Sequence, residues 1–260
     1  MDIRDTAVAA AKEAGGLLKE RFGNAGAVEF KGAIDLVTEM DRLSERIILS
    51  RIKSAFPDHG ILTEESPEEV THSGCRWIID PIDGTTNYAH AFPVFCVSIA
   101  LERDGEVECG VVYHPMLDEL FVAEKGRGAT LNGKRISVSK TRNLDRSLLA
   151  TGFPYDIRTS ELNNLDNFAS FAVKAQARRR AGSAALDLSY VACGRFDGYW
   201  EMKLRPWDVA AAALIVKEAG GIITAFGGGE FSIYGHECLA SNALVHEEML
   251  SVLNKRKNRT

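Results

Sequence analysis

The sequence predicts an α/β protein with mixed sheets. Three observations support this: apolar residues recur at helical spacing near the N-terminus, short β-type runs separated by turn signals fill 95–138, and strand and helix patterns alternate from 148 onward. No linker divides the 260 residues. We therefore expect a single domain, with an N-terminal part of about 1–145 and a C-terminal part of about 146–260.

Two helices begin the N-terminal part. Apolar residues from Ile3 to Leu18 recur at helical spacing, and Gly23 ends this first helix. Thr38 is placed to begin the second helix, and Pro57 to end it, because proline cannot continue a helix.

Short strands follow the helices. Apolar runs at 60–63 and 76–79 predict strands that carry acidic residues at their ends. Four later runs are separated by the turn dipeptides D-G, H-P and N-G and predict an antiparallel meander. These runs lie at 95–101, 107–113, 119–123 and 136–138.

The C-terminal part alternates strand and helix patterns. The expected strands lie at 148–152, 197–201, 222–225 and 238–241. The expected helices lie at 160–175, 183–192 and 208–219, with one more helix near the C-terminus. The basic tail K-R-K-N-R-T at 255–260 is expected to fray.

Composition narrows the possible functions. The net charge of −5 argues against a surface devoted to nucleic acid. Five scattered cysteines, without a C-x-x-C pair, indicate reduced thiols in a cytoplasmic protein. The N-terminus lacks the pattern of a signal peptide, and the longest apolar runs are too short to span a membrane.

Carboxylates gather at the ends of the predicted elements. The five segments are V-T-E-M-D (37–41), T-E-E-S (63–66), D-P-I-D-G-T (80–85), Y-W-E (199–201) and W-D-V-A-A (207–211). Magnesium prefers oxygen ligands and keeps water and substrate phosphate in its shell. Two such ions about 3.5–4 Å apart could hold both the attacking and the leaving oxygen of a phosphoryl displacement.

The segment 80–85 carries the most information. Asp80 ends a strand, and Pro81 is expected to stop the sheet ladder and turn the chain. The turn would return Asp83 to Asp80, with the Ile82 carbonyl free to join a cation site. Gly84 would let a ligand approach the backbone, and the amides after it would open a short helix that attracts phosphate. The alternative is an ordinary surface turn, since Asp-Pro and Asp-Gly are common turn dipeptides.

The other acids have structural alternatives of similar weight. Strand alternation lets at most one of Glu64 and Glu65 point inward, and we assign Glu64. Asp208 follows Pro206 at the start of a helix, where an acid suits the helix dipole. Its functional interpretation is a ligand of a second metal ion.

Asp41 lies three residues after Thr38, which is the spacing of a helix capping box. Taken alone, this spacing favours the capping role. A functional Asp41 would instead orient Thr85 or a nucleophilic water.

Together these segments resemble the inositol monophosphatase family. D-P-I-D-G-T-T-N (80–87) and W-D-V-A-A-A-A-L-I-V-K-E-A-G-G (207–221) are similar to its two signatures. G-S-A-A-L-D-L-S-Y-V-A-C-G-R-F-D-G-Y-W-E (182–201) is similar to its substrate-side segment, and the resemblance runs in order from about 5 to 245. It implies a five-layer αβαβα sandwich, dependence on two to three Mg²⁺ ions, lithium sensitivity and a homodimer.

The resemblance also implies roles for individual residues. Glu64, Asp80 and the Ile82 carbonyl would bind the first metal ion, and Asp80, Asp83 and Asp208 the second. Glu64 would also serve a weaker third ion, near which Lys31 is expected.

The remaining implied roles concern the water and the substrate. Glu64, Asp41 and Thr85 are the implied catalytic residues, the last two helping to activate the water. Gly84 and Thr85 would hold the phosphate through their amides, and Glu201 would bind hydroxyl groups of the alcohol. The implied substrate contacts are Asp83, Gly84, Thr85, Ser183, Ala184, Glu201 and Asp208.

The predicted function is therefore Mg²⁺-dependent hydrolysis of inositol 1-phosphate by a metal-activated water. The main alternative is a fructose-1,6-bisphosphatase or another sugar phosphatase activity. A role in binding nucleic acid or protein stays open because Arg178, Arg179 and Arg180 form a basic run, although such runs are more often solvated faces.

Overall fold

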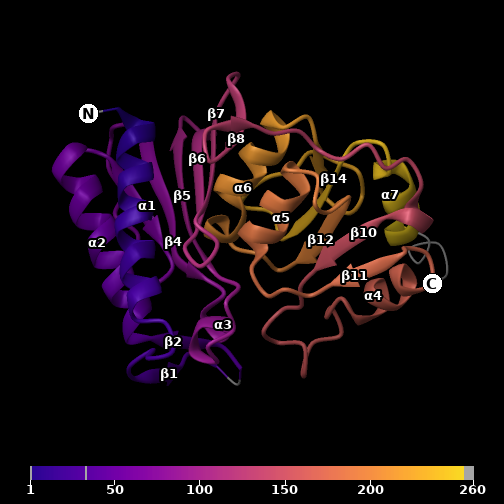
Figure 1. Cartoon of the computed structure of the whole chain (residues 1–260), viewed down its shortest axis with the longest axis horizontal. Coiled ribbons are helices and arrows are strands. Elements are labelled where there is room, and N and C mark those ends of the chain that lie inside the picture. The colour runs from indigo at the N-terminus through magenta and orange to yellow at the C-terminus, as the bar shows by residue number, and fades with distance from the viewer. Residues whose placement is uncertain (1, 33, 255–260) are drawn as a thin grey trace.

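The computed structural model describes residues 2–32 and 34–254, and these form five alternating layers of helices and sheets (Figure 1). Helices α1 (Ile3–Glu20) and α2 (Glu39–Ala55) cover the outer face of a seven-stranded sheet. Helices α5 (Ala184–Ala192) and α6 (Pro206–Glu218) fill the space between this sheet and a five-stranded sheet. Helices α4 (Leu165–Ala172) and α7 (His246–Asn254) cover the far face. The expected αβαβα sandwich is confirmed.

The seven-stranded sheet has the order β3-β4-β5-β6-β7-β8-β9. Only β3 and β4 pair in parallel, and the other neighbours are antiparallel. The strands are β3 (Gly60–Thr63), β4 (Cys75–Asp83), β5 (Cys96–Arg103), β6 (Glu106–His114), β7 (Glu119–Glu124), β8 (Gly128–Leu131) and β9 (Lys134–Arg135). The expected meander is therefore present.

The five-stranded sheet has the order β11-β10-β12-β14-β13. Strand β10 pairs in parallel with both of its neighbours, and the remaining pairs are antiparallel. The strands are β10 (Leu148–Thr151), β11 (Ala177–Arg179), β12 (Gly198–Met202), β13 (Ile222–Thr224) and β14 (Glu237–Ser241). A separate hairpin joins β1 (Val28–Phe30) to β2 (Leu36–Thr38).

The two parts of the chain share a hydrophobic core. Helix α6 packs against β5 and β6 of the first sheet, and Gly110 lies so close to Ala211 that a Cβ there would meet its carbonyl oxygen at 2.5 Å. One buried cluster includes Ile78 and Val112 from the N-terminal part together with Leu214 and Ile215 from α6. None of the described helices is both long and apolar enough to cross a membrane.

Three sequence predictions about the elements were wrong. Residues 136–138 are not a strand, and the meander ends with β8 and β9. Val138 donates its N–H to the Ala219 carbonyl after α6 instead of to a neighbouring strand. The predicted helix 160–175 is confined to α4, and 152–164 is largely loop. Pro81 does not stop β4, which continues to Asp83. The predicted fraying of 255–260 lies outside the described residues.

Candidate active site

A cavity of about 530 Å³ opens beside the end of β4 and the beginnings of α3 (Thr85–Ala89), α5 and α6. Every site residue expected from the sequence lines it except Asp41. The lining members of that set are Glu64, Asp80, Ile82, Asp83, Gly84, Thr85, Ser183, Ala184, Glu201 and Asp208. Segments far apart in the sequence are thus brought to one place.

A β-bulge places Asp80 and Asp83 together. Residues three apart in a regular strand point to opposite faces of the sheet. Here Asp80 pairs with Ser98 and Asp83 with Cys96, so β4 contains one residue more than β5 over this stretch. The extra residue brings both carboxylates to the same face. The sequence prediction of a tight turn at Pro81 was wrong in mechanism, but the two acids do meet.

The bulge is held by hydrogen bonds from outside the ladder. Ser44 Oγ on α2 donates to the Pro81 carbonyl at 2.8 Å, and the Ile82 N–H donates to Asp80 Oδ1 at 3.0 Å. Proline lacks an N–H, so it leaves no unpaired donor in the bulge. A strand can therefore continue through this proline.

Asp41 caps α2 and also contacts Thr85. It is fully buried, and its Oδ2 accepts from the N–H of Thr38 (2.7 Å) and from its hydroxyl (2.6 Å), completing the capping box of α2. Its Oδ1 lies 2.9 Å from the Thr85 hydroxyl. Burial raises the pKa of Asp41, while the bonds from Thr38 and Thr85 act in the opposite direction.

Thr85 is positioned between two acceptors. Its hydroxyl oxygen lies 2.9 Å from Asp41 Oδ1 and 3.0 Å from the Ile82 carbonyl. The hydroxyl has one proton, so donating it to Asp41 leaves the Ile82 carbonyl as an acceptor for another group. Asp41 does not line the cavity and therefore acts on it through Thr85.

Gly84 joins the bulge to α3 in a left-handed conformation, with φ of 107°. A Cβ at this position would lie 3.0 Å from the Val94 carbonyl and 3.3 Å from the Gly182 carbonyl. Both the dihedral angle and the crowding by backbone exclude a larger residue.

We predict that Gly84→Ala lowers the free energy of unfolding by about 2–4 kcal/mol, because strain and overpacking add. Gly16→Ala is the matched control, since Gly16 lies inside α1 with no atom within 4 Å of the added methyl group. The control is expected to be neutral or to stabilise by up to about 1 kcal/mol. Chemical denaturation measures both variants, and equal effects would contradict the prediction.

Asp83 is fixed by the beginning of α5. Its Oδ2 accepts from the Ser183 hydroxyl (2.7 Å) and the Ala185 N–H (2.6 Å), and the Ala184 N–H lies 3.3 Å from its Oδ1. Burial raises the pKa of Asp83 to about 6, although these bonds favour the ionised form. In this structure Ser183 and Ala184, expected at the substrate, orient Asp83.

Asp208 occupies the first turn of α6. Its Oδ2 accepts from the backbone N–H of Arg205 at 2.7 Å, which is the helix-capping arrangement that its sequence position indicates. Burial is the largest cause that raises its pKa, and the charges of Asp83 and Glu64 add to it. The capping bond uses only Oδ2 of Asp208. Capping α6 is therefore compatible with a second role of this carboxylate at the cavity.

Glu64 and Glu65 both contact Lys31, which follows β1. The Lys31 ammonium lies 3.1 Å from Glu64 Oε1 and 2.5 Å from Glu65 Oε1. Glu64 lines the cavity and Glu65 does not, which agrees with the expectation that one of the two acids points inward. The reason is not strand alternation, because both residues follow β3 in a bend. Burial raises the pKa of Glu64 to about 7.

The acids at the cavity repel one another. Burial raises the pKa of Asp80 well above its ordinary value, and the charges of Glu64, Asp83 and Asp208 raise it further. Among residues 2–32 and 34–254, no three His, Cys, Asp or Glu side chains form a cluster that could hold a metal ion by itself. The donor set nevertheless fits a hard divalent cation, which accepts carboxylate and carbonyl oxygens and completes its shell with water and phosphate.

Glu201, on β12, also lines the cavity. It accepts from the Tyr199 hydroxyl, and burial raises its pKa to about 7. Gly152 makes room for it, since a Cβ on Gly152 would lie 2.2 Å from both carboxylate oxygens.

The sequence analysis missed several residues of the cavity. Gly152, Tyr155 and Asp156 come from the loop after β10, and Lys203 contacts this loop through Asp156 Oδ2 at 2.6 Å. Asp187 also lines the cavity, and the one available signal was an acidic residue inside the apolar helix segment A-A-L-D-L.

The arginine run does not form one basic surface. Arg178 donates to the Ala172 carbonyl and lies over the ring of Phe168. Arg179 is exposed, and Arg180 lines the cavity. The three arginines therefore lie in different surroundings and do not form a single basic patch.

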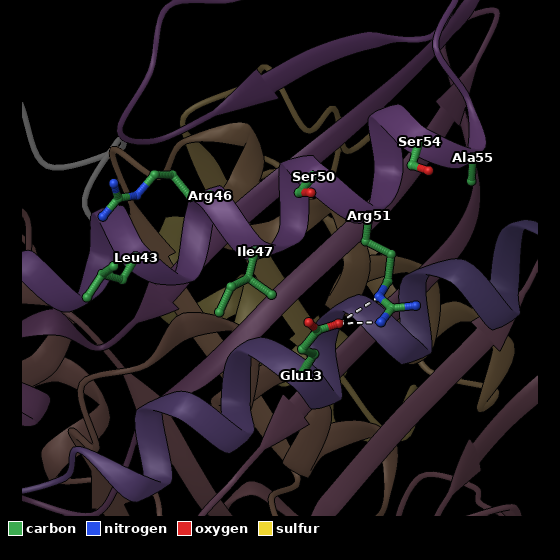
Figure 2. A pocket seen from close by; sticks show the side chains of 8 residues that line it. All are labelled: Glu13, Leu43, Arg46, Ile47, Ser50, Arg51, Ser54 and Ala55. Carbon is green, nitrogen blue, oxygen red and sulfur yellow. Dashed lines mark hydrogen bonds and ion pairs between the residues drawn. The ribbon is translucent and has the colours of Figure 1, made fainter.

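A second cavity, of about 690 Å³, lies on the outer side of α1 and α2 (Figure 2). Figure 2 shows Glu13 of α1 bound to Arg51 of α2, where Arg51 Nε donates at 2.8 Å. The remaining lining residues are Leu43, Arg46, Ile47, Ser50, Ser54 and Ala55. It has no cluster of acids, and the oxygen-rich cavity is the better candidate for catalysis.

The chain is similar over nearly its whole length to known proteins. Residues 2–258 match the inositol monophosphatase family. The chain is 47% identical over 252 residues to an inositol-1-monophosphatase of Synechocystis, covering 96% of this chain and 88% of that protein. It is 45% identical over 248 residues to the Nus factor SuhB of Escherichia coli, covering 94% and 93%.

Solved structures show the same similarity. The inositol monophosphatase of Anabaena superposes with a TM-score of 0.88 at 43% identity, covering 96% of this chain and 94% of that chain. The Thermotoga maritima IMPase superposes with a TM-score of 0.90 at 38% identity, covering 100% and 99%.

Proposed function

Because the chain belongs to the inositol monophosphatase family and is a phosphatase of that family, we propose that it hydrolyses inositol 1-phosphate to inositol and phosphate in a Mg²⁺-dependent reaction. The proposal is supported above all by the gathering of Glu64, Asp80, Asp83 and Asp208 around one cavity that also contains Glu201. Four of these acids fit cations that bind phosphate, and Glu201 fits a polyol.

The proposed metal ligands are those that the resemblance implies. Glu64, Asp80 and the Ile82 carbonyl would hold one ion, and Asp80, Asp83 and Asp208 another, while Glu64 would also contact a weaker third ion. Bound Mg²⁺ would supply Lewis-acid activation of water and neutralise phosphate charge. In the absence of Mg²⁺, the fold keeps these oxygens close together although the carboxylates repel one another.

Thr85 is proposed to orient the attacking water. Since its only proton can go to Asp41 Oδ1, its oxygen is free to accept a hydrogen bond from a water in the cavity. Asp41 thereby acts as a positioning residue, and its own place is fixed by Thr38. The amides of Gly84 and Thr85, at the beginning of α3, are proposed to donate to the phosphate.

Glu201 is proposed to bind the alcohol. The Tyr199 hydroxyl donates to its Oε2 and Gly152 leaves space for it, so the carboxylate is held in a fixed place in the cavity lining. A fixed acceptor suits a hydroxyl group, because leaving a buried acceptor unpaired costs about 1–3 kcal/mol.

Phosphate release from a panel of esters tests the function. Inositol 1-phosphate, fructose 1,6-bisphosphate and histidinol phosphate would each be measured with Mg²⁺ and with a chelator. We expect Mg²⁺-dependent release that is fastest with inositol 1-phosphate. Faster release from the bisphosphate would favour the bisphosphatase alternative, and no release from any ester by the folded protein would contradict the proposal.

A homodimer, lithium inhibition and a cytoplasmic location belong to the same proposal. Light scattering tests the dimer, and lithium in the phosphate-release assay tests the inhibition. Arg179 is exposed and does not line the cavity, so the remaining hypothesis of nucleic-acid binding predicts salt-dependent RNA affinity that Arg179→Ala weakens.

A further inference from the structure

One buried carboxyl group at the cavity has no assigned role. Asp187 lies in the first turns of α5, is 1% exposed and lines the cavity. Its Oδ1 has no hydrogen-bond partner among the described residues. Buried carboxyl oxygens are nearly always paired, because an unpaired one costs free energy.

The surroundings of Asp187 are acidic. Burial raises its pKa well above the ordinary value, and the charges of Glu201 and then Asp83 raise it further, while Arg180 acts in the opposite direction. The charge of Asp83 likewise helps raise the pKa of Glu201. Two acids against one arginine make this part of the cavity unfavourable for a second phosphate and suitable for neutral groups that donate hydrogen bonds.

We propose that Asp187 binds a hydroxyl group of the substrate alcohol beside Glu201 and so makes the enzyme selective for polyol monophosphates. The inference rests on the proposed phosphatase function and adds a specificity-determining residue to it. A hydroxyl that donates to Asp187 Oδ1 pairs the orphaned oxygen, and an ester without further hydroxyl groups leaves it unpaired.

A purely structural role for Asp187 is the competing explanation. Helix α5 already has its cap, since Ser183 Oγ accepts from the Leu186 N–H and Asp83 accepts from the Ala185 N–H. Among residues 2–32 and 34–254, no hydrogen bond to Asp187 Oδ1 holds another element in place. Removing the carboxylate is therefore expected to spare the fold.

The test compares two esters in the presence of Mg²⁺. For Asp187→Ala we expect kcat/KM to fall at least about 10-fold with inositol 1-phosphate, mainly through KM, and to change less than about twofold with p-nitrophenyl phosphate. Asp187→Asn keeps the shape and one acceptor oxygen, so a smaller loss of selectivity is expected. Melting temperatures of both variants establish that they fold.

Glu201→Gln supplies the matched control. It should shift the ratio of the two esters in the same direction, and the double variant should lose less than the sum of the two single effects if both acids bind the same alcohol. Calorimetry with free inositol, in the presence of Mg²⁺ and phosphate, should show weaker binding to Asp187→Ala than to the wild type.

The outcomes separate the two proposals. If the wild type releases no phosphate from inositol 1-phosphate or from any other ester, the proposed function fails and the role of Asp187 fails with it. If the wild type is active but the folded Asp187 variants lose activity equally with both esters, or bind inositol as the wild type does, the function stands and the assignment of Asp187 is overturned.

Discussion

Replacing Asp83 with asparagine is expected to lower kcat/KM at least about 100-fold while the protein stays folded. Asp83 is a proposed metal ligand, and Asn offers a neutral oxygen in place of an anionic one. The same carboxylate accepts from Ser183, Ala184 and Ala185, and the amide oxygen of Asn can keep part of these bonds. Loss of a buried charge among three other acids offsets the weakened bonds.

Phosphate release from inositol 1-phosphate, together with the melting temperature, checks this prediction. Asp145→Asn is a control of the same chemistry, since Asp145 lies exposed in the short helix Leu144–Arg146 and does not line the cavity. The control should keep full activity. Unchanged turnover in a folded Asp83→Asn protein would contradict the metal assignment.

The second large effect is expected in the absence of metal. With a chelator present, the melting temperature should fall as the pH rises from about 4 to about 7. The pKa of Asp83 is raised to about 6 and that of Glu64 to about 7, so the folded protein holds more protons than the unfolded chain in this range. The stability that Asp83 and Glu64 contribute is fully present below about pH 4, and it is lost as the pH rises through their folded-state pKa values of about 6 and about 7.

Asp80→Asn is expected to reverse this loss in part. Asp80 is the acid that Glu64, Asp83 and Asp208 all disfavour in its ionised form, so its neutral replacement should raise the melting temperature at pH 7.5 in chelator by about 5 °C. Mg²⁺ should then stabilise the variant much less than the wild type. Thermal unfolding with and without Mg²⁺ measures both effects.

Either of two outcomes would contradict this account. A chelated wild type that becomes more stable between pH 4 and pH 7 would show that hydrogen bonds outweigh the repulsion. An Asp80→Asn protein that melts lower than the wild type in chelator would show that the Asp80 carboxylate stabilises the bulge, through its bond to Ile82 N–H, more than its charge destabilises the cavity.

Much of the fold was readable from local sequence. The capped start of α2 at Thr38, the strand 60–63 and the helix that Ser183 begins all agree with prediction, because caps, helical spacing and strand runs act between near neighbours in the chain. The strand expected at 136–138 failed because strand pairing is a long-range choice, and Val138 bonds to the end of α6 instead.

The sequence by itself determined the family and the set of acids, since ordered blocks of residues at element ends carry both. Only the tertiary structure decided how the acids meet. A bulge, stabilised by Ser44 from α2, puts Asp80 and Asp83 on one face, and Asp41 reaches Thr85 across 44 residues. The same packing leaves Asp187 Oδ1, near Glu201, without a hydrogen-bond partner in the described part of the chain. Such contacts depend on how distant elements pack, and local sequence patterns do not contain that information.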